Sequence, residues 1–534
     1  MSRPEVLPQA DLYYSYLAAQ QYLRANQIEQ AIKAYNDALE KAPRSPVLLT
    51  ELATLYVRQG KIELALKLAE RAVEYNPDYE QAFVLLGQLY AGLGQNARAI
   101  AAYNRVVELN PINEDVHLLL GALYAQEGRF SEAMEMFDRL RDLLPGNPLA
   151  LYYKARVFLD MKFYDQAEAS YQEVLSVDPA FENALLDLAY IYEVTNRTED
   201  AEETYISIFS FDPSSVQAHT RLGNLYMREG KFEEALQQFG QILRADRKDV
   251  ESRLKIGIIH LQQKKYEEAI QDFSYLLKEQ PQYDQALYYL GSTYEEKGDL
   301  EQAILSFRAV ASNSPLWSTA QIRLGLIFAK MKDFTSGVEV LQNALEKQPD
   351  VPDTYLYLAI LYEDQERYAE AIQVLEKGLR KAPQDIDLLF RKGMVLDRLE
   401  RRKEAIQAME QILEIEPENA NALNYVGYTY AEMGINLVKA RELIQMALEQ
   451  EPDDGYIMDS LAWVHFKMGQ PGRALEIILR ALEKVPGDPV IHEHMGDIYL
   501  ELGKKSKALE SYQKALEYEH TQPEKIRAKL KDLK

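Results

Sequence analysis

The chain has 534 residues, no cysteine and a formal net charge of −24 at pH 7. The absence of cysteine excludes disulfides, catalytic thiolates, cysteine-ligated zinc and iron–sulfur clusters. The excess of acidic residues argues against a protein that coats nucleic acid or an anionic membrane, because both need positively charged faces.

The N-terminal segment, residues 1–11, is a polar leader that precedes the first regular pattern. It has no apolar run and does not read as a signal peptide. No stretch of the chain approaches the ~20 apolar residues that a membrane helix needs. We therefore expect a cytoplasmic protein or, if a leader has been removed, a periplasmic or outer-membrane-attached one.

From residue 12 onward the chain repeats itself with a period of 34 residues, which indicates a repeat architecture rather than a set of globular domains. Arg247 takes the place of one proline, and the interval lengthens to 35 residues between Pro417 and Pro452. The other prolines that mark the period are Pro43, Pro77, Pro111, Pro145, Pro179, Pro213, Pro281, Pro315, Pro349, Pro383 and Pro486.

Each unit predicts two amphipathic helices joined by a short turn, since its apolar residues lie three and four apart. A small residue precedes each proline by twelve positions, as Ala99 precedes Pro111, and a large apolar residue such as Tyr103 precedes most of them by eight. Glycines such as Gly94 end the first helix, where a left-handed residue is needed, and the proline ends the second. We expect the small residues where helices press together and the aromatic residues in the gaps beside them.

This spacing of Leu-Gly, Tyr, Ala, Phe, Ala and Pro resembles the tetratricopeptide repeat family over residues 12–522. The resemblance implies an all-α, right-handed superhelical solenoid of about fifteen helix-turn-helix units, one of them with 35 residues. Residues 523–534, with Ile526, Leu530 and Leu533 on one face, are expected to form a helix that caps the last unit.

Local departures from the repeat are predicted to leave the fold intact. Lys154 and Lys392 stand where leucine is usual, and Gly337 stands where alanine is usual. The extra residue of the longer unit lies between Gly434 and Ala440, in the turn that joins its two helices. A turn can absorb one residue, whereas an insertion inside a helix rotates its apolar face by about 100°.

No motif predicts an enzyme, a cofactor or a metal site. The glycine run GLGQNA at residues 92–97 is similar to a dinucleotide-binding loop, but it falls in an interhelix turn with no strand before it. His492 and His494 are two residues apart, so on a helix they point about 200° apart and cannot bind one metal without another segment. Asn196 begins a glycosylation sequon that matters only in a eukaryotic secretory route.

The family resemblance implies that the first helix of each unit faces a concave groove that binds extended peptides or helices. The sixth position of successive units, here called the ladder, alternates basic and aromatic residues in its later part. One hypothesis is that the ladder binds a partner, since arginine grips carboxylates bidentately and tyrosine offers rigid contact area. The other is that it pairs internally with acids such as Glu295 and Glu363. The ladder consists of Tyr153, Asp187, Arg221, Lys255, Tyr289, Arg323, Tyr357, Arg391 and Tyr425.

Further groove candidates surround the ladder. Asn224 and Lys255 are similar to part of the carboxylate clamp of chaperone-binding family members, but Thr220 and Tyr289 stand where the rest of the clamp belongs. We therefore do not expect chaperone binding, and the asparagine ladder of sugar-transferase members is also absent. The remaining candidates are Tyr152, Arg156, Asn183, Tyr190, Asn224, Arg228, Asn424, Tyr428 and Trp463.

The sequence as a whole predicts a non-catalytic scaffold that binds a partner protein and no nucleic acid. Its last third resembles the C-terminal repeats of bacterial tetratricopeptide proteins, many of which are predicted to be lipoproteins or envelope-associated. That resemblance implies a role in assembling an envelope complex, such as secretion or polysaccharide export machinery. Two alternatives stay open, a self-associating structural solenoid and a regulatory subunit of a separately encoded enzyme.

Overall fold

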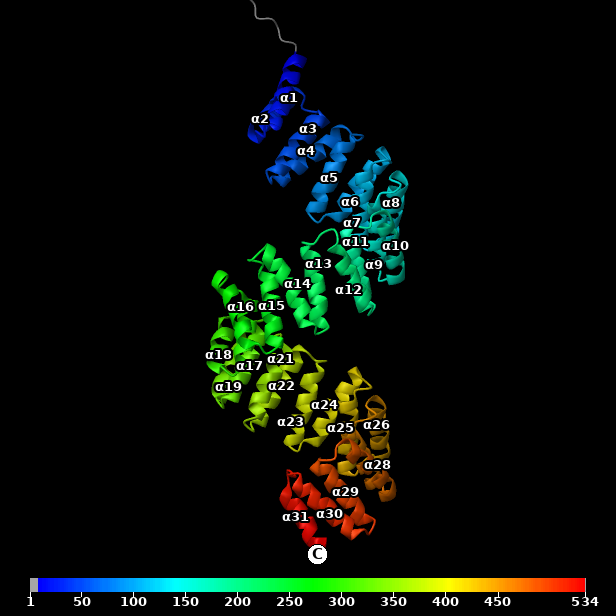
Figure 1. Ribbon diagram of the computed structural model, residues 1–534, viewed down its shortest axis with the longest axis vertical. Helices are drawn as coiled ribbons and strands as arrows, with labels where there is room; N and C mark the ends of the chain where they lie inside the picture. Colours follow the sequence, from blue (N-terminus) through cyan, green and yellow to red (C-terminus); the bar gives the residue numbers. More distant parts are fainter. Residues whose placement is uncertain (1–7, 534) are drawn as a thin grey trace, which may run out of the picture. The chain divides into compact units, whose positions relative to one another are not determined.

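The computed structural model describes residues 8–533, and the side chains of residues 10–533. Within this range the chain forms α-helices joined by short turns and contains no strand. It divides into two compact units, Met1–Ser252 and Arg253–Lys534, and each unit is a stack of helix pairs (Figure 1). No helix of the described range is long and apolar enough to cross a membrane.

The first unit consists of helix pairs that follow one another along the chain. Helix α15 (Val250–Gln262) begins at the end of the first unit and belongs mostly to the second unit. The helices before it are α1 (Pro8–Arg24), α2 (Ile28–Lys41), α3 (Pro46–Arg58), α4 (Ile62–Tyr75), α5 (Glu80–Gly92), α6 (Asn96–Leu109), α7 (Glu114–Gln126), α8 (Phe130–Leu143), α9 (Pro148–Asp160), α10 (Tyr164–Val177), α11 (Glu182–Val194), α12 (Thr198–Ile208), α13 (Val216–Arg228) and α14 (Phe232–Ala245).

The second unit continues the same order of pairs and ends with one unpaired helix, α31. Its helices after α15 are α16 (Tyr266–Glu279), α17 (Asp284–Lys297), α18 (Leu300–Ala309), α19 (Trp317–Lys330), α20 (Phe334–Lys347), α21 (Pro352–Glu363), α22 (Tyr368–Lys381), α23 (Ile386–Arg398), α24 (Arg402–Ile415), α25 (Ala420–Met433), α26 (Leu437–Gln450), α27 (Gly455–Lys467), α28 (Pro471–Lys484), α29 (Pro489–Glu501), α30 (Lys505–Glu517) and α31 (Pro523–Leu533).

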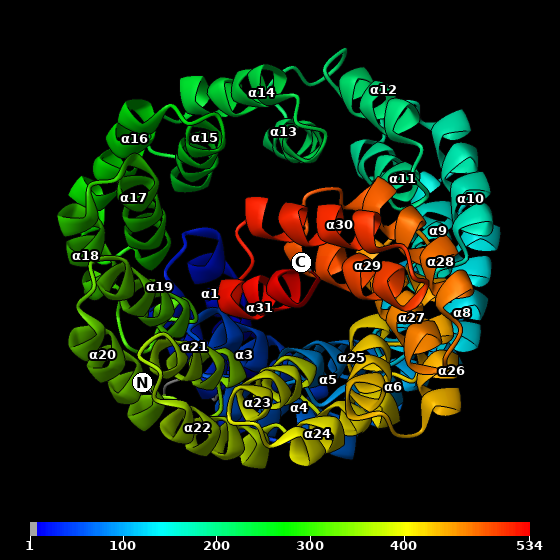
Figure 2. The same cartoon turned by 90° about the horizontal axis from the view of Figure 1, so that it is seen from below.

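Odd-numbered and even-numbered helices occupy different sides of the stack. Apart from α15 and α31, each odd-numbered helix packs on the even-numbered helix that follows it, and α19 and α25 also contact the next odd-numbered helices, α21 and α27. Within the second unit, Figure 2 shows α17, α19, α21 and α23 on the inner side and α18, α20, α22 and α24 on the outer side. Within each unit the odd-numbered helices therefore share one side of the stack, which we call the first-helix face.

A left-handed residue closes the turn within most helix pairs. Gly94 has φ 69° and Gly230 has φ 70°, a conformation that costs glycine little because it has no Cβ atom. After α5, the amide N–H of Gln95 donates to the carbonyl of Tyr90 at 2.8 Å, as in a Schellman motif. The predicted role of these glycines is confirmed, and Lys162 and Asn196, both with φ 60°, take the same position in two other pairs.

The glycine in the middle of a first helix makes room for the large side chain of its partner helix. A Cβ atom on Gly87 would lie 2.3 Å from the Tyr103 ring, and one on Gly121 would lie 2.6 Å from the Phe137 ring. Tyr103 and Phe137 are each 1% exposed, so they fill this space completely. The predicted pairing of a small residue with a neighbouring aromatic residue is confirmed at these positions.

The extra residue of the longer repeat is absorbed where α25 ends. The turn from Gly434 to Asn436 holds two left-handed residues, with φ 66° and 50°, and Ala440 is again fully buried. Helix α26 therefore presents its apolar face in the usual orientation. The structure confirms that the insertion leaves the helix pair intact.

Two lysines that replace the usual leucine form ion pairs with the preceding second helix. The Nζ atom of Lys154 lies 2.8 Å from Asp138 Oδ1, and that of Lys392 lies 3.6 Å from Glu376 Oε1. Both lysine side chains are about a quarter exposed, so their charged ends reach the surface while their stems pack inside.

The two ends of the chain differ in how much the structure describes. Residues 1–7 of the predicted leader lie outside the described range, and residues 8–11 belong to α1. At the other end α31 packs on α30, with Ile526 fully buried and Leu530 and Leu533 packed against the same cluster. Residue 534 of the predicted cap lies outside the described range.

Candidate functional site

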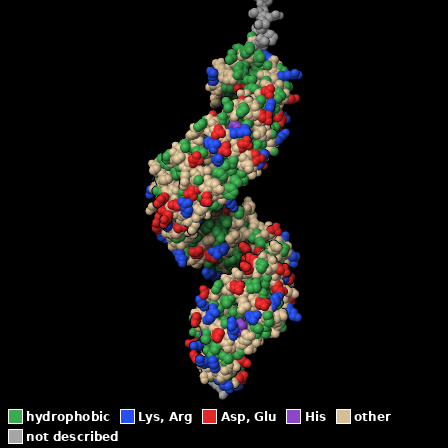
Figure 3. All heavy atoms as spheres, turned by 90° about the vertical axis from the view of Figure 1, so that its right-hand side faces the viewer, with side chains coloured by type: hydrophobic (Ala, Val, Ile, Leu, Met, Phe, Trp, Pro, Cys, Tyr) green, Lys and Arg blue, Asp and Glu red, His purple; other side chains and the backbone are tan. Residues whose placement is uncertain are grey.

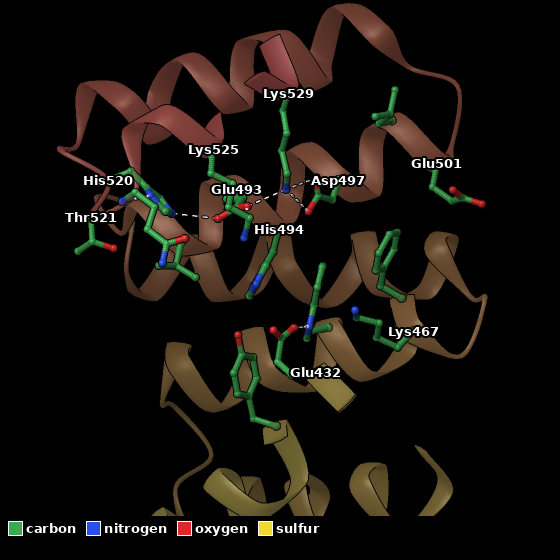
Figure 4. Close-up of a pocket in the computed structure, with 16 residues that line it drawn as sticks. Glu432, Lys467, Glu493, His494, Asp497, Glu501, His520, Thr521, Lys525 and Lys529 are labelled. Atoms are coloured by element: carbon green, nitrogen blue, oxygen red, sulfur yellow. Dashed lines mark hydrogen bonds and ion pairs between the residues drawn. The ribbon is translucent and has the colours of Figure 1, made fainter. Parts of the chain in front are cut away.

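Two cavities open on the first-helix face, one in each unit. The C-terminal cavity lies between α25, α27, α29 and α31 and has a volume of about 610 Å³ (Figure 4). The Asp187 cavity lies between α9, α11 and α13 and has a volume of about 360 Å³. Both are lined by charged and aromatic side chains, which are the groups that recognise polar peptides.

An aromatic stack forms one wall of the C-terminal cavity. The Trp463 ring stacks on His494 with ring centroids 4.1 Å apart and on Phe466 with centroids 5.0 Å apart. Its indole Nε1–H donates to Glu432 Oε1 at 2.5 Å, which fixes the orientation of the ring. The ring centroids of Tyr428 and His494 are 6.3 Å apart. Burial raises the pKa of the Tyr428 hydroxyl, which therefore stays protonated.

A charge cluster forms the opposite wall, as Figure 4 shows. Glu493 on α29 is 5% exposed and lies 2.7 Å from Lys529, 3.0 Å from Lys525 and 2.9 Å from His520. Lys529 also contacts Asp497 at 2.6 Å. Burial alone raises the pKa of Glu493, but the hydrogen bonds and charges of Lys529 and Lys525 outweigh it and lower the pKa to about 2.

His492 and His494, the histidines of residues 492–497, point to different places. His494 Nδ1 lies 2.9 Å from Asp459 Oδ2 in a buried pair. Burial lowers the pKa of His494, but the Asp459 carboxylate outweighs it and holds the pKa above its ordinary value. The His492 ring instead stacks on Tyr518 at 5.3 Å, and its Nε2 contacts the carbonyl of Pro486 at 3.0 Å. In the described residues no three His, Asp or Glu side chains converge on a possible metal position.

The Asp187 cavity is organised around one half-buried carboxylate. The hydroxyls of Tyr152 and Tyr171 each donate to Asp187 Oδ2 at 3.1 Å. The guanidinium of Arg156 donates to the Tyr152 hydroxyl at 3.2 Å and lies 3.8 Å from Asp187. Burial and the Asp187 charge raise the pKa of Tyr171, so this hydroxyl stays a donor.

Models of the tetratricopeptide repeat family match the chain along most of its length. The matches cover residues 14–55, 50–111, 84–148, 158–213, 220–284, 265–316, 328–389, 386–419 and 460–523. The chain belongs to the tetratricopeptide repeat family. Its described residues form only helices, so the predicted all-α solenoid of tetratricopeptide helix pairs is confirmed.

Other similarities are short or distant. A TPR repeat-containing protein of Pseudomonas aeruginosa is 44% identical over 52 residues, and the chain spans about a tenth of that protein's length. Among solved structures, a tetratricopeptide repeat protein from Parabacteroides merdae is 19% identical with a TM-score of 0.39, covering 47% of this chain and 98% of that one. Yeast Tom70 is 15% identical with a TM-score of 0.37, covering 74% and 96%. The Cut9–Hcn1 hetero-tetramer of the APC/C is 13% identical with a TM-score of 0.38, covering 91% and 96%.

The ladder of this tetratricopeptide repeat protein lies on the first-helix face, and two of its arginines form ion pairs there. Arg323 Nε lies 3.2 Å from Glu295 Oε2, and Arg391 Nη1 lies 3.4 Å from Glu363 Oε2. Each acid belongs to the preceding first helix, as the internal-pairing hypothesis expects. Both arginine side chains still expose about a third of their surface, 35% and 36%. They remain available to a partner, and partner binding stays a prediction.

The aromatic members of the ladder rest on the second helices or inside the stack. Tyr153 stacks on Phe137 at 5.6 Å, and Tyr289 stacks on Phe273 at 6.0 Å. Tyr357 is half-buried against the core of α21 to α23. Burial and the charge of Asp397 raise the pKa of the half-buried Tyr425. Lys255 is half-buried on α15.

Some of the remaining predicted groove residues line or adjoin the two cavities, and the others lie outside them. Tyr152, Arg156, Tyr190 and Arg221 lie in or beside the Asp187 cavity, and Tyr190 is 41% exposed. Tyr428 and Trp463 line the C-terminal cavity. Outside both linings lie Asn183, which is exposed, Asn224 and Asn424, which are half-buried, and Arg228, which pairs with Glu193.

Sequence reasoning missed the residues that complete each cavity. The C-terminal cavity includes Glu493, which no sequence pattern assigned to a site, and Lys525 and Lys529, which were predicted only as part of the capping helix. Their spacing of four residues, which places both lysines on one face of α31, was the available signal. Lys162 of the Asp187 cavity gave no signal, because it is an ordinary turn residue in the sequence.

Proposed function

We propose that the protein is a non-catalytic scaffold that binds an extended segment or a helix of a partner protein on its first-helix face. The family membership supports protein partners in general. The observation that carries the finer proposal is the row of half-exposed ladder side chains on this face, including Arg323, Tyr357 and Arg391. Rigid aromatic area and partly desolvated guanidinium groups are typical of residues that dominate binding energy at interfaces.

We further propose that the partner belongs to a bacterial envelope complex, such as secretion or polysaccharide export machinery. The support is the resemblance of the last third of the chain to bacterial envelope-associated repeat proteins. The short match to a Pseudomonas protein agrees with a bacterial source. The cellular compartment, periplasmic or outer-membrane-attached after removal of a leader or otherwise cytoplasmic, is part of the same proposal.

Crosslinked co-purification from the native host tests the proposal. The triple variant Arg323→Gln, Tyr357→Ala and Arg391→Gln is expected to reduce the main crosslinked partner at least about tenfold, since interface anchors each contribute over 1 kcal/mol. Quantitative mass spectrometry of the crosslinked material gives the measurement. The full length of the gene product is determined in the same experiment.

A matched control removes the same groups from the starts of two second helices. The control variant carries Arg367→Gln, Tyr368→Ala and Arg401→Gln. Both of its arginines are exposed, and their ion pairs are with Glu370 and Glu404, each three residues further along the chain. Equal partner recovery from both triple variants contradicts a role of the ladder in binding. Light scattering at several protein concentrations then separates a self-associating solenoid from a monomeric one.

A further inference from the structure

The Asp187 cavity carries an excess of positive charge in a strongly acidic chain. Among its lining residues are three basic side chains, Arg156, Lys162 and Arg221, against two acidic ones, Asp160 and Asp187. The whole chain has a net charge of −24, and acidic and basic side chains are interspersed over the face seen in Figure 3. A local surplus of guanidinium groups inside a cavity therefore stands out from the average surface.

The half-buried carboxylate of the cavity, Asp187, is already engaged by tyrosines. Asp187 is 15% exposed and accepts hydrogen bonds from two tyrosine hydroxyls, Tyr152 and Tyr171. Its distance of 3.8 Å from Arg156 is too long for a hydrogen bond, although the charges still attract. Asp187 therefore orients Arg156 without consuming the donors of its guanidinium.

Arg156 keeps most of its hydrogen-bonding capacity for a ligand. Its side chain is 46% exposed, and one of its five N–H groups donates to Tyr152. Because Tyr152 is buried and held by Asp187, the guanidinium is anchored before a ligand arrives. An anchored fork loses less conformational entropy on binding than a free side chain does.

Arg221 reaches the same cavity from the next first helix. The acid closest to it in the repeat pattern, Glu193, is held by Arg228 and by the Tyr205 hydroxyl, which donates at 2.5 Å. The charge of Arg221 opposes the burial that raises the pKa of the Tyr205 hydroxyl. Within the described part of the chain, Arg221 has no carboxylate at ion-pair distance, so its charge faces the cavity uncompensated.

We propose that the Asp187 cavity binds an acidic side chain of an extended peptide, with the carboxylate between Arg156 and Arg221. This inference rests on the proposed function and names the chemical class of partner for one part of the first-helix face. Guanidinium groups from two helices can grip a carboxylate by charge-assisted hydrogen bonds. Tyr190, which is 41% exposed at the same cavity, offers a flat surface to the adjoining part of the peptide.

Fluorescence anisotropy on the full chain tests the inference with three labelled peptides. The probes are an amidated octaglutamate peptide, an octalysine peptide and an uncharged Gly-Ser octapeptide with a free C-terminal carboxylate. We expect octaglutamate to bind, octalysine not to bind, and added salt to weaken octaglutamate binding because both sides are partly exposed. The Gly-Ser peptide distinguishes a terminal carboxylate from acidic side chains.

Matched double variants locate the binding. Arg156→Gln with Arg221→Gln is expected to weaken octaglutamate binding at least tenfold, since it removes both guanidinium groups of the cavity. Arg105→Gln with Arg197→Gln removes the same charge from exposed arginines of the same unit and should change binding less than twofold. Circular dichroism melting of both variants checks that the helices remain folded.

Three results overturn the inference. They are no binding of octaglutamate, equal binding of octalysine, and equal loss in both double variants. Binding of the Gly-Ser peptide alone rejects acidic side chains as the source of the carboxylate. If octaglutamate does not bind as expected but the Arg323, Tyr357 and Arg391 variant still loses its crosslinked partner, only the acidic class of ligand is rejected. If that variant recovers its partner as well as the unchanged protein does, the proposed ladder interface is rejected.

Discussion

Glu493 shows how a single buried carboxylate can determine the position of a helix. A charge with 5% exposure is unfavourable inside a protein unless it is paired. Its partners Lys525 and Lys529 both belong to α31, and His520 lies in the turn before that helix. Docking of α31 therefore satisfies the charge on α29, in addition to burying Ile526.

We predict that Glu493 stabilises the second unit in a pH-dependent way. Its folded pKa of about 2 lies below the ordinary 4.5, so its contribution is complete above pH 4.5 and is lost as the pH falls toward 2. Glu493→Gln should lower the free energy of unfolding by about 2 kcal/mol at pH 7. The difference from the unchanged protein should shrink at pH 3.5 in urea unfolding followed by tryptophan fluorescence.

The control for this prediction is an exposed ion pair on the neighbouring helix. Glu510 pairs with Lys514, and the two side chains are 65% and 44% exposed. Glu510→Gln should change the free energy of unfolding by less than ~0.5 kcal/mol at either pH. If Glu493→Gln lowers the free energy of unfolding by the same amount at pH 7 and pH 3.5, the stabilisation by Glu493 is not ionic in origin.

In the helix pairs that carry a mid-helix glycine, the fit between the two helices depends on one missing side chain. Gly121 on α7 lies against the Phe137 ring on α8, and a Cβ atom there would lie 2.6 Å from Cε1 of that ring. Phe137 is 1% exposed, so its ring is enclosed by other side chains. The pair is therefore close-packed at the glycine, where even one added methyl group forces a shift.

We predict opposite effects for two glycine-to-alanine variants of the first unit. Gly121→Ala should lower the free energy of unfolding by about 1–3 kcal/mol through overpacking. Gly240→Ala should raise it by about 0.5–1 kcal/mol, because a Cβ atom at this helical position of α14 meets no atom within 4 Å. Urea unfolding followed by circular dichroism measures the free energy of unfolding of both variants. A lower free energy of unfolding in Gly240→Ala as well as in Gly121→Ala would contradict the expected gain in helix propensity at Gly240.

Over the whole molecule, contacts connect helices that are close in the sequence. A helix packs mainly on its pair partner, on the next pair and, on the first-helix face, on the next first helix. Such a chain has stability that is approximately a sum over repeats and their neighbouring interfaces. A local defect should therefore weaken its own region more than a distant one.

We predict that unfolding of the two units can be distinguished. Trp317 and Trp463 are the two tryptophans of the chain, and both belong to the second unit, so their fluorescence reports on residues 253–534. Gly121→Ala should lower the urea midpoint seen by circular dichroism but leave the fluorescence midpoint within experimental error. Equal shifts by both probes would instead indicate one cooperative transition.

The sequence predicted the repeat, its helix pairs and its turns because these depend on local periodicity. Pro43 and its successors, Gly94 in the turn and small residues such as Ala99 each act through neighbours within one unit, so their spacing was sufficient evidence. The insertion after Gly434 could be placed in a turn for the same reason. Ladder positions on the first-helix face also followed, since one residue per unit recurs on the same side of each first helix.

What each exposed side chain contacts was decided only by the tertiary structure. Arg323 pairs with Glu295, although the sequence offered more than one acid to the ladder, and Arg156 is anchored through Tyr152 and Asp187. Lys529 reaches Glu493 across α29 and α31, and no spacing in the sequence selects that pair. Periodicity states which face a residue occupies, but the distance between charges on neighbouring helices depends on how the helices stack and on which rotamers that stacking leaves room for.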